Sequence, residues 1–290
     1  MIEEALKKYN FFEGKEFEVF NIQDYGRKSK FKIKMKGKCY TLILSEERIK
    51  PYIKKLAILG DNFKKIIGLK YLSEDNKVLI LDYFGNGNGI DLVKIDSTLE
   101  NNDYELQLKN ILDNIHSIKH EYVDFSINGY KDWKDYYLSE ISDKIINIYN
   151  QNLITNDVKK ILLEKLEESS KRYIGFQTTL IHADVTPLNV CINKEDNSLY
   201  LIDYDDFKIG DPLMDISRII NCKDMSKIFK LLVDKYYYQY ENDINHLFYT
   251  LRVNINWYNH IIEKNQEAMY NLNKAREDIF YIIDSIINHV

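Results

Sequence analysis

The sequence predicts an α+β protein with a small, antiparallel, strand-rich first part and a larger, mainly helical second part. Short apolar runs separated by polar turns fill the first third of the 290-residue chain. Apolar residues at helical spacing dominate the rest of the chain. A glycine-rich break, GNGNG at residues 85–89, separates the two regions. We therefore expect a first lobe over residues 1–84 and a second lobe over residues 85–290.

The first part is expected to hold five strands and one helix. The runs that read as strands are residues 17–22, 30–35, 40–44, 66–72 and 77–83. Lys36-Gly37-Lys38 is a turn sequence between the second and third strands. Residues 45–59 have the apolar spacing of a helix, which Ser45 could cap.

The second part shows successive apolar helix faces, followed by a strand–turn–strand and then more helices. The faces comprise Leu108, Ile111, Leu112 and Ile115, then Trp133, Tyr137, Ile141, Ile145 and Ile148, then Val158, Ile161, Leu162 and Leu166. Residues 190–193 and 199–203 read as two short strands joined by the polar turn KEDNS. Helical spacing resumes at Pro212.

Composition excludes several classes of protein. A hydrophobic fraction of 45% is enough for a packed core. The net charge is −5 and no basic stripe with interleaved aromatics occurs, so a nucleic-acid partner is not expected. No apolar run approaches the roughly 20 residues that span a bilayer, so no membrane partner is expected. The N-terminal MIEEALKKYN lacks a signal-peptide core, and the three cysteines are scattered, which favours a cytoplasmic location.

The strand–turn–strand carries the chemistry. His182, Asp184 and Asn189 form H-x-D-x-x-x-x-N, and Asp203 ends the second apolar run. If the hairpin is symmetric about Asp196, Asn189 lies opposite Asp203, with β-carbons about 5 Å apart. An amide oxygen and a carboxylate at that separation could share Mg²⁺, which prefers hard oxygen ligands. Asp184, on the loop before the first strand, could orient or deprotonate a substrate hydroxyl.

The same block resembles a known family. Its elements are His182-Ala183-Asp184, Asn189, Ile202-Asp203-Tyr204, and Asp211-Pro212 with Asp215-Ile216. In this order and spacing they resemble the aminoglycoside phosphotransferase and choline kinase superfamily, which has the two-lobed protein-kinase-like fold. ILDNIHSI at residues 111–118 also resembles a helix of that family. Four matched elements in order are specific, whereas any one alone is weak.

The resemblance implies a set of roles. Asp184 would be the catalytic base or would orient the acceptor hydroxyl, and Asn189 and Asp203 would hold Mg²⁺. The segment of residues 81–84, with Asp82 and Phe84, would be a hinge whose backbone binds the purine of ATP or GTP. The implied partners are a nucleoside triphosphate and a small-molecule acceptor with a hydroxyl group.

Further residues of the block have supporting or structural readings. The resemblance implies that His182 supports the catalytic loop. Asp215 either bonds that loop or stabilises its own helix dipole. Asp211 before Pro212 is ordinary helix-capping chemistry, and His116 on an apolar face reads as a core histidine.

One departure from the family concerns the cation that holds the nucleotide phosphates. The family places Lys or Arg on the third strand, where this chain has Ile43. Lys32, Lys34 and Lys36 alternate along one face of the preceding strand. We expect Lys34, near the middle of that strand, to bind the phosphates in place of the missing residue.

The function expected from these residues is a Mg²⁺-dependent small-molecule kinase of the aminoglycoside-phosphotransferase type. A choline- or ethanolamine-type kinase is an alternative, because tyrosines and Trp257-Tyr258 could form a cage for a quaternary ammonium. A nucleotide-binding pseudokinase is another, supported by the missing third-strand lysine. A phosphohydrolase is disfavoured because no His-x-His or paired Asp-x-Asp motif accompanies the block.

Overall fold

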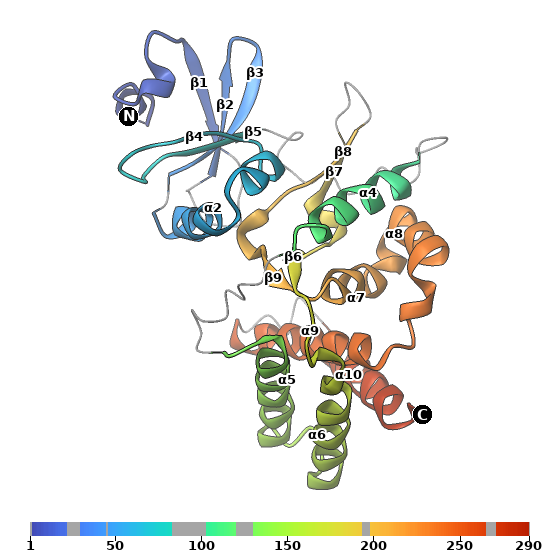
Figure 1. Ribbon diagram of the computed structural model, residues 1–290. Coiled ribbons are helices and arrows are strands. Elements are labelled where there is room, and N and C mark those ends of the chain that lie inside the picture. Colours follow the sequence, from blue (N-terminus) through green and yellow to red (C-terminus); the bar gives the residue numbers. More distant parts are fainter. Residues whose placement is uncertain are drawn as a thin grey trace. The chain divides into compact units, whose positions relative to one another are not determined.

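The computed structural model describes residues 2–21, 30–44, 46–82, 103–119, 130–192, 198–264 and 271–289. The chain packs into two compact units, each built from separate stretches of sequence (Figure 1). The first unit comprises residues 1–111 and 186–207, and the second comprises residues 112–185 and 208–290. The predicted lobe boundary after residue 84 falls outside the described residues and stays a prediction.

A five-stranded antiparallel sheet forms much of the first unit. The strand order is β1-β2-β3-β5-β4, with bounds Phe17–Asn21 for β1, Lys30–Met35 for β2, Lys38–Ile43 for β3, Leu69–Leu72 for β4 and Leu79–Asp82 for β5. The predicted α+β class with a strand-rich first part is therefore confirmed. The fourth strand begins three residues later than predicted, because Ile66 still belongs to the preceding helix.

The turn between β2 and β3 is as tight as its sequence suggests. Met35 pairs with Lys38, which leaves only Lys36 and Gly37 in the loop. Both have positive φ, 49° and 79° respectively, as a two-residue hairpin turn requires. Lys36 therefore lies in the turn, and the prediction that it continues the lysine face of the strand is wrong.

One face of the sheet is covered by the N-terminal segment. That segment consists of α1 (Ile2–Leu6) and the short η1 (Asn10–Phe12). The buried residues packed together on this face are Leu6, Phe12, Phe31, Ile33, Leu42, Val78 and Ile80. Because strand side chains alternate between faces, Lys32 and Lys34 belong to the opposite face.

Helix α2 (Glu46–Ile66) follows β3 and extends beyond the predicted helix, which ended at residue 59. The backbone of Gly60 is not helical (φ 57°, ψ −136°), so two helical segments meet at a kink there. A glycine reaches this conformation without a steric penalty. The buried side chains of α2 include Ile49, Tyr52 and Phe63.

The second unit is mainly helical (Figure 1). Helix α4 (Tyr104–His116) begins in the first unit and ends in the second. The other α-helices in the described residues of this unit are α5 (Trp133–Asn150), α6 (Asn156–Ser170), α7 (Leu213–Asn221), α8 (Lys227–Leu232), α9 (Ile244–Glu263) and α10 (Leu272–Ile287). Side chains that accept backbone N–H bonds begin α5, α6, α8, α9 and α10; they are Asp132, Thr155, Ser226, Asp243 and Asn271.

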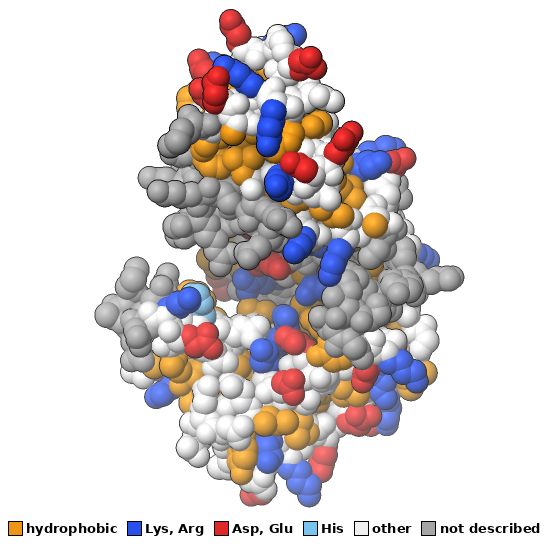
Figure 2. Space-filling view, turned by 90° about the vertical axis from the view of Figure 1, so that its left-hand side faces the viewer, with side chains coloured by type: hydrophobic (Ala, Val, Ile, Leu, Met, Phe, Trp, Pro, Cys, Tyr) orange, Lys and Arg blue, Asp and Glu red, His pale blue; other side chains and the backbone are white. Residues whose placement is uncertain are grey.

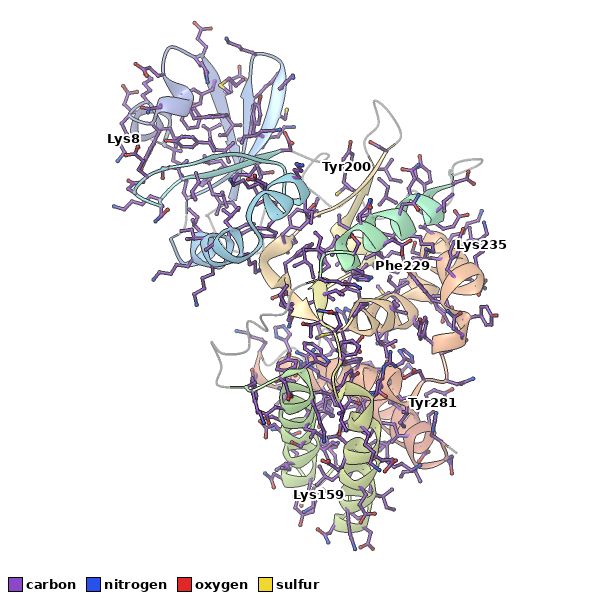
Figure 3. All side chains as sticks on the ribbon, viewed as in Figure 1. Lys8, Lys159, Tyr200, Phe229, Lys235 and Tyr281 are labelled. Carbon is purple, nitrogen blue, oxygen red and sulfur yellow. The ribbon has the colours of Figure 1, made fainter. Side chains whose placement is uncertain are left out.

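Helix α9 lies at the centre of this unit, where it packs against α5, α7 and α10. Trp133 at the start of α5 is buried and donates a hydrogen bond to the hydroxyl of Tyr249 on α9, 3.0 Å away. Figure 3 labels side chains at both extremes of burial: Phe229 of α8 is fully buried, whereas Tyr281 of α10 is 75% exposed. A short two-stranded pair, β6 (Thr179–Ile181) with β9 (Lys208–Gly210), completes the unit.

The described surface agrees with the small net charge of the chain. In the face drawn in Figure 2, acidic and basic side chains are interspersed. None of the described helices is long and apolar enough to span a membrane.

Candidate functional site

The loop that carries Asp184 begins directly after β6. Ala183 has a left-handed backbone (φ 68°), which turns the chain between His182 and Asp184. The backbone N–H of Asp184 approaches Nδ1 of the buried His182 at 3.3 Å. This contact agrees with the supporting role that was expected for His182.

The loop is anchored by Asp215, in the first turn of α7. Its fully buried carboxylate accepts hydrogen bonds from the backbone N–H groups of His182, at 2.8 Å, and Ala183, at 2.6 Å. Nε2 of His116 lies 2.9 Å from the same carboxylate. The prediction that Asp215 bonds the loop of Asp184 is therefore confirmed, and His116 is a further partner of that carboxylate.

The protonation of Asp215 follows from these partners. Burial works to raise the pKa of Asp215, because a charged group loses its hydration. The hydrogen bond and charge of His116, with smaller contributions from His182, outweigh burial and lower the pKa. An ionised carboxylate is thus held at the base of the loop.

Asp211 has a different environment. Its Oδ1 accepts from the backbone N–H of Leu213, the first residue of α7, at 3.0 Å, although Pro212 and not Asp211 occupies the N-cap position that was predicted for Asp211. Its Oδ2 also accepts from the hydroxyl groups of Tyr173 (2.8 Å) and Tyr249 (3.2 Å). Burial raises the pKa of Asp211 despite these bonds. Asp211 therefore ties α7 to the helical core.

Arg218, which the sequence prediction did not single out, contacts Asp184. Its Nε lies 3.2 Å from Oδ1 of Asp184, and both side chains are partly exposed. Arg218 follows Asp215 by three residues on α7, and residues at that spacing share one face of a helix. This spacing was the available signal, since a residue on the face of Asp215 must point toward the loop that Asp215 holds.

The hairpin of β7 (Val190–Ile192) and β8 (Leu199–Leu201) belongs to the first unit. Val190 pairs with Leu201, and the backbone N–H of Ile202 donates to the carbonyl of Asn189 at 2.9 Å. Ile202, not Asp203, is therefore opposite Asn189, and the predicted register is wrong by one residue. Asp203 lies just beyond the ladder in a left-handed conformation (φ 63°, ψ 66°), which ends the strand and re-aims the side chain.

Asn189 and Asp203 still lie at adjacent ends of one hairpin. Asn189 is 8% exposed, and Asp203 is exposed. Together they offer one amide oxygen and one carboxylate, a set of hard oxygen donors that suits Mg²⁺. Among the described residues there is no group of three or more His, Cys, Asp or Glu that could hold a metal. Mg²⁺ does not require one, because it commonly keeps waters and phosphate oxygens as ligands.

The structure describes two of the three residues that were predicted to bind the nucleotide, Lys34 and Asp82. Lys34 lies in the middle of β2, exposed, and opposite Cys39. Asp82 ends β5; its N–H donates to the carbonyl of Gly68 (2.8 Å) and its carboxylate pairs with Lys70 (2.8 Å). Phe84 lies outside the described residues. The roles of all three stay predictions.

The first unit contains a buried lysine, Lys55, whose position was not predicted from the sequence. Lys55 on α2 is only 9% exposed, and its Nζ donates to the backbone carbonyl of Tyr204 at 3.1 Å. Tyr204 directly follows Asp203 in the chain. No sequence pattern signals this contact, because a lysine among helical residues is usually solvated.

Comparisons with known proteins agree with this architecture. The model of the phosphotransferase enzyme family matches residues 102–243, which include Asp184, Asn189 and Asp203. Among curated protein sequences, none matches the chain.

Solved structures with the same fold include two aminoglycoside phosphotransferases. One is a thermostable mutant of APH(4)-Ia in a ternary complex with ADP and hygromycin B (TM-score 0.63, 14% identity, 98% of each chain covered). The other is ADP-bound APH(2'')-Ib (TM-score 0.59, 16% identity, 99% of this chain and 98% of that chain covered).

A choline kinase has the fold as well. It is LicA from Streptococcus pneumoniae (TM-score 0.58, 14% identity, 98% of this chain and 97% of that chain covered). The model of the phosphotransferase enzyme family matches the part of the chain that carries the motif block, and the shared fold agrees with it, so the resemblance inferred from the sequence is confirmed.

Proposed function

We propose that this protein is a Mg²⁺-dependent small-molecule kinase that transfers the γ-phosphoryl group of ATP or GTP to an acceptor hydroxyl. The observation that carries the proposal is the construction of the Asp184 loop. A buried, ionised carboxylate binds two consecutive backbone N–H groups of that loop. Such an anchor fixes the neighbouring Asp184 in one orientation, and positioning is the main contribution of a protein to phosphoryl transfer.

Each residue of the loop then has a defined task. The carboxylate of Asp184 would accept a hydrogen bond from the acceptor hydroxyl and take up its proton as the new bond to phosphorus forms. Arg218, 3.2 Å from that carboxylate, would hold it in place. Asp215 and His116 would keep the backbone of the loop fixed.

Asn189 and Asp203 would hold the metal ion through their oxygen atoms. When bound, Mg²⁺ would neutralise charge on the phosphates. The carboxylate of Asp203 would contribute a full negative charge to ion binding and Asn189 only a dipole. We therefore expect Asp203 to be the stronger ligand.

The acceptor class is proposed as aminoglycoside-like. The fold relatives include a complex with hygromycin B as well as a choline kinase, so aminoalcohols belong in the same test. The position of Arg218 also restricts which acceptors would fit. Because its guanidinium lies beside Asp184, a cationic group directly next to the reacting hydroxyl would be repelled. Neutral sugars therefore complete the panel.

The experiment is a nucleotide-consumption assay with Mg²⁺ and ATP or GTP against aminoglycosides, aminoalcohols and neutral sugars. Acceptor-dependent turnover that requires Mg²⁺ and disappears in Asp184→Asn supports the proposal. Tight nucleotide binding without turnover on any acceptor would contradict it and favour the nucleotide-binding pseudokinase.

A further inference from the structure

Phosphate binding needs a cation that β3 does not provide at the expected position. Ile43, where the family has Lys or Arg, is 1% exposed and part of the apolar core. The first residue of β3, Lys38, is exposed beside the turn. A nucleoside triphosphate carries several negative charges, and their binding to protein normally uses Lys or Arg.

Lys55 is a cation of the same unit in a different setting. It lies on α2, among the buried side chains of the helix, with 9% of its surface exposed. Burying an ammonium group is costly unless anions or hydrogen-bond acceptors surround it. The carbonyl of Tyr204, 3.1 Å from Nζ, is one such acceptor.

Aromatic side chains pack α2, which carries Lys55, against the segment that contains Tyr204. The ring of Phe63 on α2 contacts that of Phe207 (centroids 6.0 Å apart), and Phe207 contacts Tyr204 (4.9 Å). Helix α2 therefore packs on the segment η5 (Tyr204–Asp206) that follows Asp203. The ammonium of Lys55 binds the backbone of the residue next to the proposed metal ligand.

Lys34, the cation predicted from sequence, has a different setting from Lys55. Lys34 is exposed at mid-strand, and the neighbouring Lys36 is a turn residue. A long side chain in solvent loses more entropy on binding than one already held. The structure thus provides, from α2, a pre-positioned cation near Asp203.

We propose that Lys55 binds the phosphates of the nucleotide and replaces, from α2, the cation that β3 lacks. The proposal rests on the proposed function insofar as it takes the ligand to be a nucleoside di- or triphosphate held near Asp203. It differs from the prediction from sequence, which assigned this task to Lys34.

The test measures the affinity of the full-length protein for ADP and for adenosine, both with Mg²⁺, by calorimetry. Lys55→Gln removes the charge but keeps an N–H donor for the carbonyl of Tyr204, and Lys55→Arg keeps the charge. Lys54→Gln, the same change at the exposed neighbouring position of the same helix, is the matched control. Lys34→Gln tests the assignment predicted from sequence.

We expect Lys55→Gln to weaken ADP binding by about 10- to 100-fold, the usual effect of one charge-assisted hydrogen bond. Adenosine binding should stay within about two-fold, because adenosine has no phosphate, and the salt dependence of ADP binding should fall. Lys55→Arg should retain most of the ADP affinity, and Lys54→Gln and Lys34→Gln should match the wild type.

Other results would overturn the inference. Unchanged ADP affinity in Lys55→Gln would show that Lys55 does not bind phosphate. An equal loss of affinity for ADP and for adenosine would show that Lys55 acts only on the structure. If Lys55→Gln does not fold, the same comparison of ADP with adenosine is made in Lys55→Arg. Nucleotide binding with the predicted Lys55 effect but no phosphoryl transfer would refute the kinase function and leave the inference standing. A wild type that binds neither ligand would refute both.

Discussion

Replacing Asp215 by Asn tests whether the loop of Asp184 depends on a buried charge. The carboxylate accepts hydrogen bonds from the N–H of His182 (2.8 Å), the N–H of Ala183 (2.6 Å) and His116 (2.9 Å). An amide has one oxygen, so it would leave buried donors unsatisfied and His116 without its anion. We expect a loss of about 3–5 kcal/mol in the free energy of unfolding at neutral pH, as for other broken buried pairs.

The effect should depend on pH with a defined sign. The pKa of Asp215 in the folded protein lies below the ordinary value of 3.8. Its ionised form therefore stabilises the fold above pH 3.8, and that contribution is lost as the pH falls through the lowered folded pKa. The gap in stability between wild type and Asp215→Asn should accordingly narrow from about pH 6 to about pH 3.

Urea unfolding at both pH values, followed by circular dichroism, measures this gap. Asp157→Asn is the matched control, because Asp157 is an exposed carboxylate in the first turn of α6, as Asp215 is in the first turn of α7. A helix-dipole effect alone is worth about 0.3–1 kcal/mol and would be similar in both variants. Equal and small losses in the two would refute the anchoring role of Asp215.

Two further predictions concern the ligands and the partner of the proposed base. Asp203→Ala should weaken the binding of Mg²⁺-ADP more than Asn189→Ala, because only the carboxylate carries charge; equal effects, or no change in metal dependence, would contradict the metal assignment. Arg218→Gln should lower kcat by about 10- to 100-fold through misplacement of Asp184, with nucleotide affinity and thermal stability unchanged. A kcat equal to that of the wild type would show that Arg218 does not position the base.

The structural features that depend on local sequence patterns were predicted correctly. The bounds of β2 agree with the alternating residues 30–35, and the tight turn at Lys36-Gly37 agrees with its glycine. The fold class and the anchoring role of Asp215 were also predictable, because the motif spacing is specific.

Features set by tertiary packing were not predictable. The register of β7 and β8 differs by one residue from the predicted register, and Asp203 leaves the ladder through a left-handed backbone that a strand pattern does not reveal. The contacts of Lys55 with Tyr204 and of Arg218 with Asp184 join residues 149 and 34 positions apart, respectively. Neither pair has a sequence motif of its own.

The central claim is that Asp184 is the base of a phosphoryl transfer whose nucleotide is held by other residues. The most direct measurement combines acceptor-dependent turnover with nucleotide affinity in Asp184→Asn, which keeps the size of the side chain. We predict that turnover falls by about 10²- to 10⁴-fold. Affinity for the Mg²⁺-nucleotide should stay close to that of the wild type. Turnover within a few-fold of the wild type would remove Asp184 from the mechanism and contradict the account.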